Sequence, residues 1–234
     1  MNKFLDNYPL VNVALTIGKR AWTITAAQDQ DTLIKSVNTD EDLAAFPYGL
    51  LLWASAIGLA ERLAEQPELV RGRRVLEIGA GCGLPGLVAR ALGAARVTQT
   101  DYQEAALMLA RRNAAQNGFA GQVEHRLADW RDFPPDLLGA FDVVLGSDVL
   151  YERTLHPPLS VLLPRLLRPG GDNVVLVADP LRPQALVFME QQEQRAELFG
   201  WRQVDVEGRL ARAPDQTGRE AVQDIALFFL RPRW

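Results

Sequence analysis

The sequence predicts an α/β protein with a Rossmann-like, doubly wound sheet of seven strands, mostly parallel, with an antiparallel hairpin at its C-terminal edge. From about residue 73 onward, short apolar runs alternate with helical patterns, as in parallel strands joined by helical crossovers. A glycine-rich turn joins the first of these strands to the first helix. The last two apolar runs have no helix between them, which predicts antiparallel pairing at one edge.

The composition limits the class of protein. The chain has 234 residues, of which 48% are apolar and 23% are charged, with a net charge of −4, which suits one α/β domain with a real core. No apolar run approaches the roughly 18 residues that span a bilayer, and the N-terminus lacks the pattern of a signal peptide. The single cysteine, Cys82, excludes an internal disulfide and a cysteine-built zinc site. The pI of about 5.3 argues against nucleic acid as the main partner. From these features together we expect a cytoplasmic protein that binds no nucleic acid, membrane or metal.

The first part of the chain predicts an extension and a helix. Residues 1–45 are expected to form an N-terminal extension, with a β-hairpin whose strands span 12–16 and 21–25. A helix is expected over 52–64, at the start of a main domain that spans 46–234. This N-terminal portion is expected to cap the sheet.

The alternating part predicts the remaining elements. Pro85 lies in the first turn of one predicted helix, and Asn117-Gly118 ends the next. The predicted strands span 74–78, 95–100, 123–127, 141–145 and 173–178, and the predicted helices span 84–92, 103–116, 157–167 and 183–199. The edge hairpin is expected over 201–207 and 224–230.

The glycine-rich turn contains Gly79, Gly81 and Gly83, whose backbone can approach a ligand closely, although a tight structural turn is the alternative. The spacing is G-x-G-x-G, not the G-x-G-x-x-G of dinucleotide-binding turns. Glu77, just before the turn, would repel a pyrophosphate but suits a ligand with an ammonium group. Asp101 ends the next strand, where it accepts hydrogen bonds from ribose hydroxyls, caps the next helix, or does both. The pattern indicates a nucleoside with an amino-acid tail.

Together these motifs resemble class I, seven-strand S-adenosylmethionine-dependent methyltransferases. The resemblance covers roughly residues 45–232 and lies in Val75 to Gly83, Thr100-Asp101, Ala128-Asp129-Trp130 and Asp142 to Tyr151. Within that superfamily, the segment Tyr48 to Trp53 and the motif Ser147 to Tyr151 are similar to methyltransferase family 16, which includes many protein-lysine methyltransferases. The family's usual proline after the tryptophan is Ala54 here.

The resemblance implies that S-adenosylmethionine is the cofactor and that residues 46–234 form the methyltransferase domain. It implies transfer of a methyl group to a lysine side chain of a protein; transfer to a small amine, or cofactor binding without turnover, are the alternatives. The implied cofactor-binding residues are Trp53, Glu77, Gly79, Gly81, Gly83, Asp101, Asp129, Trp130 and Ser147. As alternatives, the two tryptophans belong to the core or rim, and Asp129 closes a turn.

Asp148 and Tyr151 are the predicted catalytic residues. The carboxylate of Asp148 is placed to orient the acceptor amine and to stabilise the positive charge that develops on its nitrogen. Tyr151 would face the same side if the chain turns helically there, with its hydroxyl bonding the amine or its ring forming part of an aromatic wall. The alternative is a helix-capping aspartate with a half-buried core tyrosine. The fourth strand carries no N-P-P-Y sequence, which argues against nucleic-acid amino groups and glutamine amides as acceptors.

Overall fold

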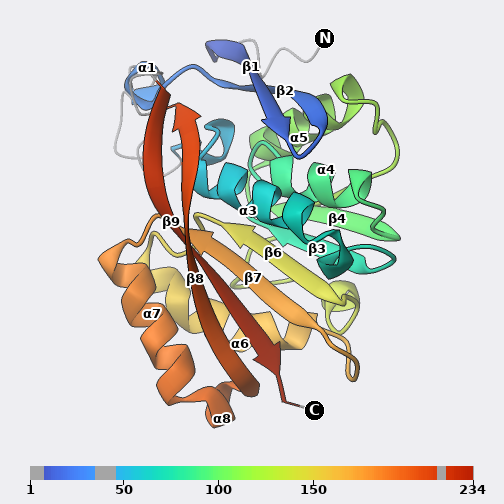
Figure 1. Ribbon diagram of the computed structural model, residues 1–234. Helices are drawn as coiled ribbons and strands as arrows, with labels where there is room; N and C mark the ends of the chain where they lie inside the picture. The colour runs from blue at the N-terminus through green and yellow to red at the C-terminus, as the bar shows by residue number, and fades with distance from the viewer. Residues whose placement is uncertain (1–7, 35–45, 215–219, 234) are drawn as a thin grey trace.

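A computed structural model of the protein describes residues 8–34, 46–214 and 220–233. Its main sheet has seven strands in the order β5-β4-β3-β6-β7-β9-β8 (Figure 1). The parallel strands are β3 (Arg74–Ile78), β4 (Arg96–Asp101), β5 (Glu124–Leu127), β6 (Val143–Ser147) and β7 (Val174–Asp179). The strands β8 (Trp201–Pro214) and β9 (Glu220–Pro232) pair antiparallel at one edge. The predicted fold class and edge hairpin are confirmed.

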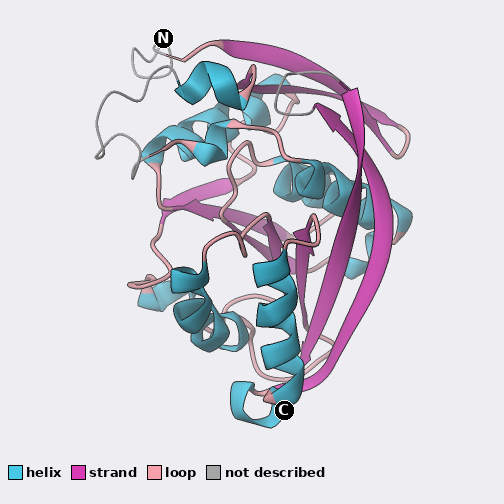
Figure 2. Ribbon diagram, turned by 90° about the vertical axis from the view of Figure 1, so that its left-hand side faces the viewer, coloured by secondary structure: helices cyan, strands magenta, loops and turns pink. Residues whose placement is uncertain are grey.

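Helices cover both faces of this sheet, which explains why its central strands are continuously apolar. Every residue of β7 is buried, for example. One face packs against α3 (Ala54–Glu65), α4 (Leu84–Ala91) and α5 (Glu104–Gln116), and the other against α6 (His156–Leu166), α7 (Pro183–Gln194) and α8 (Ala196–Phe199) (Figures 1 and 2). Short helical turns lie at Gln30–Ile34 (α1), Tyr48–Leu50, Pro67–Leu69, Pro135–Leu137 and Arg153–Leu155. The carboxyl ends of the parallel strands therefore form the open edge where a ligand can bind.

The predicted N-terminal hairpin is present as β1 (Leu10–Ile17) and β2 (Arg20–Ala27), in a sheet of its own. It is joined to α5 by Asn113, whose Oδ1 accepts from the Thr25 backbone N–H at 2.8 Å and whose Nδ2 donates to the Thr25 carbonyl at 3.0 Å. The same amide donates to the carbonyl of Cys82 in the glycine turn at 2.9 Å. Residues 1–7 and 35–45 lie outside the described residues, so the division at 45/46 stays a prediction.

The C-terminal region differs from the prediction in two respects. The edge strands are 14 and 13 residues long, and they form a ribbon that curves along one side of the molecule (Figures 1 and 2). The strand β8 is held against α3 by ion pairs from Arg209 to Glu61 and Glu65, at 3.1 and 3.0 Å. Polar residues that indicated a loop are therefore partners of a helix. The helix expected over 183–199 is interrupted at Arg195 and becomes α7 and α8. No helix among the described residues is long and apolar enough to cross a membrane.

Candidate active site

The glycine turn between β3 and α4 requires its glycines for conformation and for space. Gly79, Gly81 and Gly83 have φ values of 56°, 53° and 79°. Residues other than glycine rarely adopt this left-handed backbone conformation. A Cβ on Gly81 would lie 2.9 Å from the carbonyl oxygen of Gly49, and one on Gly79 would lie 3.0 Å from Val149 Cγ1. The turn is thus packed closely by neighbouring segments and still exposes its backbone to a pocket.

Glu77 lies behind this turn and outside the pocket wall, so its predicted contact with a cofactor stays a prediction. Its carboxylate Oε2 accepts from the Gly86 N–H at 3.0 Å and from Gln99 Nε2 at 2.6 Å. Gln99 Nε2 also donates to the Gly83 carbonyl at 2.7 Å. Glu77 is buried and does not line the pocket, and burial raises its pKa to about 8. Its side chain points toward α4, and its hydrogen bonds hold the glycine turn in place from the side opposite the pocket.

Asp101 lines the pocket and also holds the glycine turn. Its Oδ2 accepts from the Gly81 N–H at 3.0 Å, and its Oδ1 accepts from the Gln103 N–H at the start of α5, also at 3.0 Å. Asp101 thus closes the turn that leads into α5, whose N-cap residue Gln103 makes no side-chain capping hydrogen bond. Burial raises the pKa of Asp101, and the backbone N–H groups oppose this rise. The ribose contact stays a prediction.

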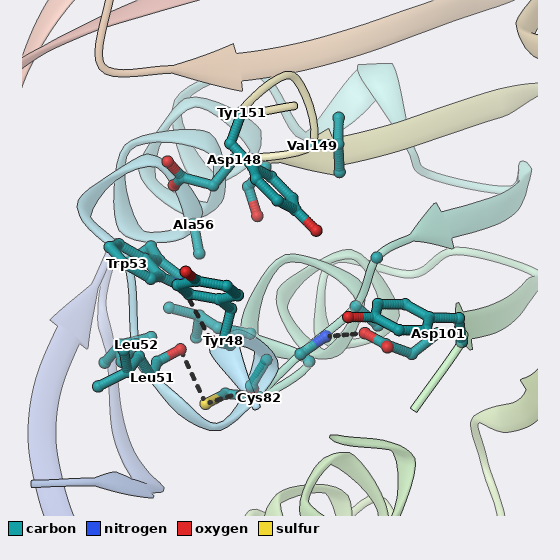
Figure 3. Close-up of a pocket in the computed structure, with 18 of the residues that line it drawn as sticks. Tyr48, Leu51, Leu52, Trp53, Ala56, Cys82, Asp101, Asp148, Val149 and Tyr151 are labelled. Carbon is teal, nitrogen blue, oxygen red and sulfur yellow. Dashed lines mark hydrogen bonds between the residues drawn. The ribbon is translucent and has the colours of Figure 1, made fainter. Parts of the chain in front are cut away.

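A pocket of about 70 Å³ lies above the glycine turn at the carboxyl edge of the sheet (Figure 3). The predicted site residues in its wall are Trp53, Gly79, Gly81, Gly83, Asp101, Trp130, Ser147, Asp148 and Tyr151. Figure 3 shows Asp148 and Tyr151 on the loop after β6, across the pocket from Asp101. The wall also contains Cys82, whose thiol is buried and has a raised pKa. Most of the predicted site residues thus converge in one place.

Asp129 lies outside this wall, in a neighbouring cavity of about 280 Å³. It closes a turn, because its Oδ1 accepts from the Arg131 backbone N–H at 2.9 Å. The Arg131 guanidinium also pairs with its carboxylate at 2.6 Å and lowers the pKa of Asp129. The two cavities share Tyr102, Trp130 and Tyr151 in their walls, so they adjoin each other. The contact of Asp129 with adenine stays a prediction.

Aromatic side chains form much of the rim. The rings of Tyr48 and Tyr151 lie 5.8 Å apart, and the indole Nε1 of Trp53 donates to the Tyr48 carbonyl at 3.1 Å. Tyr102 interacts with the Tyr151 side chain, and burial raises the pKa of Tyr151 above its ordinary value. The sequence analysis missed Tyr48 and Tyr102 as site residues. Their positions in the sequence could have indicated this role, because Tyr48 begins the segment that ends at Trp53 and Tyr102 directly follows Asp101.

Asp148 is held by an ion pair that the sequence analysis did not predict. Its Oδ1 accepts from Arg182 Nη2 at 2.6 Å, and the same guanidinium bonds Asp179 Oδ2 through Nη1 at 2.8 Å. Asp148 has a φ of 56°, so it and Tyr151 reach the pocket through a turn and not through a helix. None of the helices that follow is capped by a side chain, so the capping alternative for Asp148 is not observed. Burial raises the pKa of Asp148 to about 6, against the opposing effect of Arg182.

Comparison with known proteins identifies the family. A family model described as lysine methyltransferase matches residues 31–195, which is most of the chain. The chain belongs to this lysine methyltransferase family. Its predicted resemblance is thereby confirmed.

Individual relatives within this comparison carry different names. The chain is 38% identical to "Protein N-terminal and lysine N-methyltransferase EFM7" of Eremothecium gossypii, over 59% of this chain and 58% of the relative. It is 35% identical to "Histone-arginine methyltransferase METTL23" of Xenopus laevis, over 58% of each. It is 30% identical to "Electron transfer flavoprotein beta subunit lysine methyltransferase" of Rattus norvegicus, over 59% of this chain and 52% of the relative. The chain thus spans between half and three-fifths of the length of these relatives.

A solved structure supports the fold alone. The structure, of a protein that acts in the conversion of a disulfide bond into a thioacetal group during echinomycin biosynthesis, aligns with a TM-score of 0.58 at 22% identity. The alignment covers 75% of this chain and 82% of that one.

Among the residues that the structure describes, no group of three or more His, Cys, Asp and Glu side chains could hold a metal ion.

Proposed function

We propose that the protein is an S-adenosylmethionine-dependent N-methyltransferase that acts on a lysine side chain of a protein. One observation carries this proposal: the glycine turn and Asp101 share a single pocket with Asp148 and Tyr151. A pocket of this kind brings a binding surface for a nucleoside-type cofactor next to a carboxylate that can orient an amine. Membership of the lysine methyltransferase family supports the assignment of both parts.

The side chains present fit this cofactor. The glycine turn lines the pocket with backbone, and Val149 and Gly49 leave no space for side chains on Gly79 and Gly81. Asp101 offers carboxylate oxygens to ribose hydroxyls at the end of β4. The ring of Trp130 lies between the two adjoining cavities, where it can pack against an adenine. Glu77 supports the turn indirectly, through Gly86 and Gln99.

When bound, S-adenosylmethionine would supply an electrophilic methyl group on a sulfonium. An acceptor lysine first has to release one proton to water, so that its nitrogen has a lone pair; positive charge then develops on that nitrogen as the sulfonium charge is lost. The protein's own groups have to align the amine and stabilise that charge. Asp148 provides negative charge beside the pocket. Tyr151 keeps its hydroxyl proton at neutral pH, as tyrosines ordinarily do, and burial raises its pKa further, so it can donate to, or accept from, an amine. The rings of Tyr48 and Trp53 form the wall of a site for a cation.

The proposal is tested by incubating the protein with methyl-labelled S-adenosylmethionine and a fractionated cell lysate. We expect label in protein, recovered as methyllysine after hydrolysis, and incorporation on the order of 10²-fold slower with the Asp148→Asn variant. Methylarginine would assign the acceptor named for METTL23, and label in small molecules would assign a small amine. Cofactor binding without label in any fraction would indicate a binding module, and binding of NAD in place of S-adenosylmethionine would overturn the proposal.

A further inference from the structure

A third cavity, of about 240 Å³, lies on the other side of Trp53 from the glycine turn. It shares Leu51, Leu52, Trp53 and Asp148 with the cofactor pocket, so the two spaces are separated by a single layer of residues. Its wall contains no residue of the glycine turn and does not include Asp101. The cavity therefore adjoins the proposed site of methyl transfer without belonging to the proposed cofactor cradle.

The charge at the inner end of this cavity favours a cation. Two carboxylates, from Asp148 and Asp179, share the guanidinium of Arg182. The carboxylate of Asp179 is fully buried and that of Asp148 nearly so, and one guanidinium leaves the group with one unit of net negative charge when both acids are ionised. The only charged group bonded to Asp148 among the described residues is Arg182, and the neutral Ser55 hydroxyl lies beside the same carboxylate. In a poorly solvated place, such a group attracts a cationic amine strongly.

The side walls combine polar side chains, from Gln28, Asp29, Gln30 and Gln223, with apolar ones. Hairpin residues Val13, Ala26 and Ala27 face the cavity together with Leu52 and Pro180. A lysine side chain has four methylene groups that pack on such walls while its nitrogen stays polar. The cavity near Asp129 also has two carboxylates, from Asp129 and Glu152, beside the guanidinium of Arg131, but Glu152 and Arg131 are exposed and Asp129 is half-buried. The cavity beside Arg182 differs because its carboxylates are buried, where water screens their charge less.

We propose, on the basis of the proposed function, that this cavity admits the acceptor's lysine side chain and brings its nitrogen to Asp148. The hairpin β1–β2 and the Pro180–Arg182 loop then form the two sides of the acceptor route. The cofactor occupies the opposite side of Trp53, between the glycine turn and Trp130. A substrate lysine on a protruding segment of another protein is the acceptor that this geometry accommodates.

The test uses the single native cysteine, which is buried and has a raised thiol pKa, so that it reacts slowly with maleimides. Gln28 is exposed in the wall of the proposed route, and Thr154 is exposed in the wall of the cavity near Asp129. Full-length Gln28→Cys and Thr154→Cys are each assayed before and after reaction with a bulky maleimide. Gln122→Cys, exposed and outside every cavity wall named here, is the control.

Two readouts are measured for each protein: S-adenosylmethionine affinity by calorimetry, and methyl transfer to the lysate protein fraction. We expect alkylation of Gln28→Cys to lower transfer by about tenfold or more, with cofactor affinity unchanged, and alkylation of Gln122→Cys to change neither. Loss of transfer with retained cofactor affinity after alkylation of Thr154→Cys, but not of Gln28→Cys, would place the acceptor in the other cavity and overturn this inference. Unchanged transfer in both would also overturn it. If every unmodified protein, including the unsubstituted chain, fails to transfer methyl, the proposed function fails instead.

Discussion

The carboxyl ends of β3 and β4 differ from those of β6 and β7 in how their carboxylates are held. Asp101 and Glu77 accept hydrogen bonds from neutral donors, namely backbone N–H groups and the Gln99 amide. Asp148 and Asp179 share the guanidinium of Arg182, and Asp179 also accepts from the Arg182 backbone N–H at 2.8 Å. The first pair shapes the backbone, and the second pair sets up an electric field.

This difference assigns different tasks to the two halves of the site. A carboxylate bonded to backbone N–H groups fixes the path of the chain, so its loss should disturb binding of a cofactor that lies on that chain. Carboxylates that share one cation keep negative charge available where charge develops in a reaction. Substitutions in the two halves should therefore affect different measured quantities, and the following predictions test that separation.

The largest effect is expected for Asp148→Asn, which keeps the shape of the side chain and removes its charge. Loss of an oriented electrostatic partner of this kind costs on the order of 10²-fold in rate. S-adenosylmethionine affinity should change little, because Asp148 faces the acceptor route. Methyl transfer and calorimetric cofactor affinity are measured side by side, with the thermal midpoint as a check on folding. Full activity of this variant would remove Asp148 from catalysis, and parallel loss of binding would move it into the cofactor site.

Asp101→Ala should weaken cofactor binding while leaving most of the methyl-transfer rate intact. Removing a carboxylate that bonds the Gly81 N–H and is expected to bond ribose should weaken S-adenosylmethionine binding by about 1–3 kcal/mol. Transfer at saturating cofactor should recover most of its rate. Titration calorimetry measures the first quantity, and initial rates at rising cofactor concentration measure the second. Unchanged affinity would show that Asp101 serves only the turn and the start of α5.

Substitutions of Arg182 test whether its positive charge, next to Asp148 and Asp179, supports methyl transfer. In Arg182→Gln, Asp148 and Asp179 lose their shared cation, and we expect transfer to fall about tenfold. Arg182→Lys retains the charge and should restore most of that loss, which a purely structural role of the planar guanidinium would not allow. Cofactor affinity should be the same in both variants. If lysine rescues no better than glutamine, Arg182 does not act by its charge.

Glu77 should make the stability of the fold depend on pH. Its pKa is about 8 in the folded protein and near 4.5 when unfolded, so the folded state keeps a proton that the unfolded chain has released. The free energy of unfolding should therefore fall as pH rises from 6 to 8, by at most about 1.4 kcal/mol per pH unit. Asp148, with a pKa of about 6, titrates mainly below this window. Urea unfolding at each pH measures the slope, which Glu77→Gln should flatten; an equal slope in that variant would assign the proton elsewhere.

Some features of the two halves of the site could be predicted from the sequence, and others could not. The glycine turn, Asp101 and Asp148 could be predicted, because each follows a strand and the carboxyl ends of parallel strands meet at one edge. The ion pair of Asp148 with Arg182 joins residues 34 positions apart, in the loops that follow the neighbouring strands β6 and β7, and no local pattern encodes it. The direction of Glu77 depends on which helix covers its strand. The long ribbon depends likewise on α3, which offers Glu61 and Glu65 to Arg209.

The smallest expected effect concerns Trp53, which lies between the proposed cofactor pocket and the proposed acceptor route. Binding of S-adenosylmethionine should change tryptophan emission, and Trp53→Phe should remove part of that change, because the indole borders the bound molecule.

The chain has five tryptophans, so variants have to be compared with one another. Trp130 also lines the pocket and should contribute its own share, whereas Trp22 is buried against Phe119 and serves as the matched control. The emission change on cofactor addition is therefore measured in Trp53→Phe, Trp130→Phe and Trp22→Phe. We expect a reduced response in the first two and an unaltered one in the third. A response in Trp53→Phe equal to that of the unsubstituted protein would place Trp53 away from the cofactor, and the acceptor route would then lose the residue that separates it from the glycine turn.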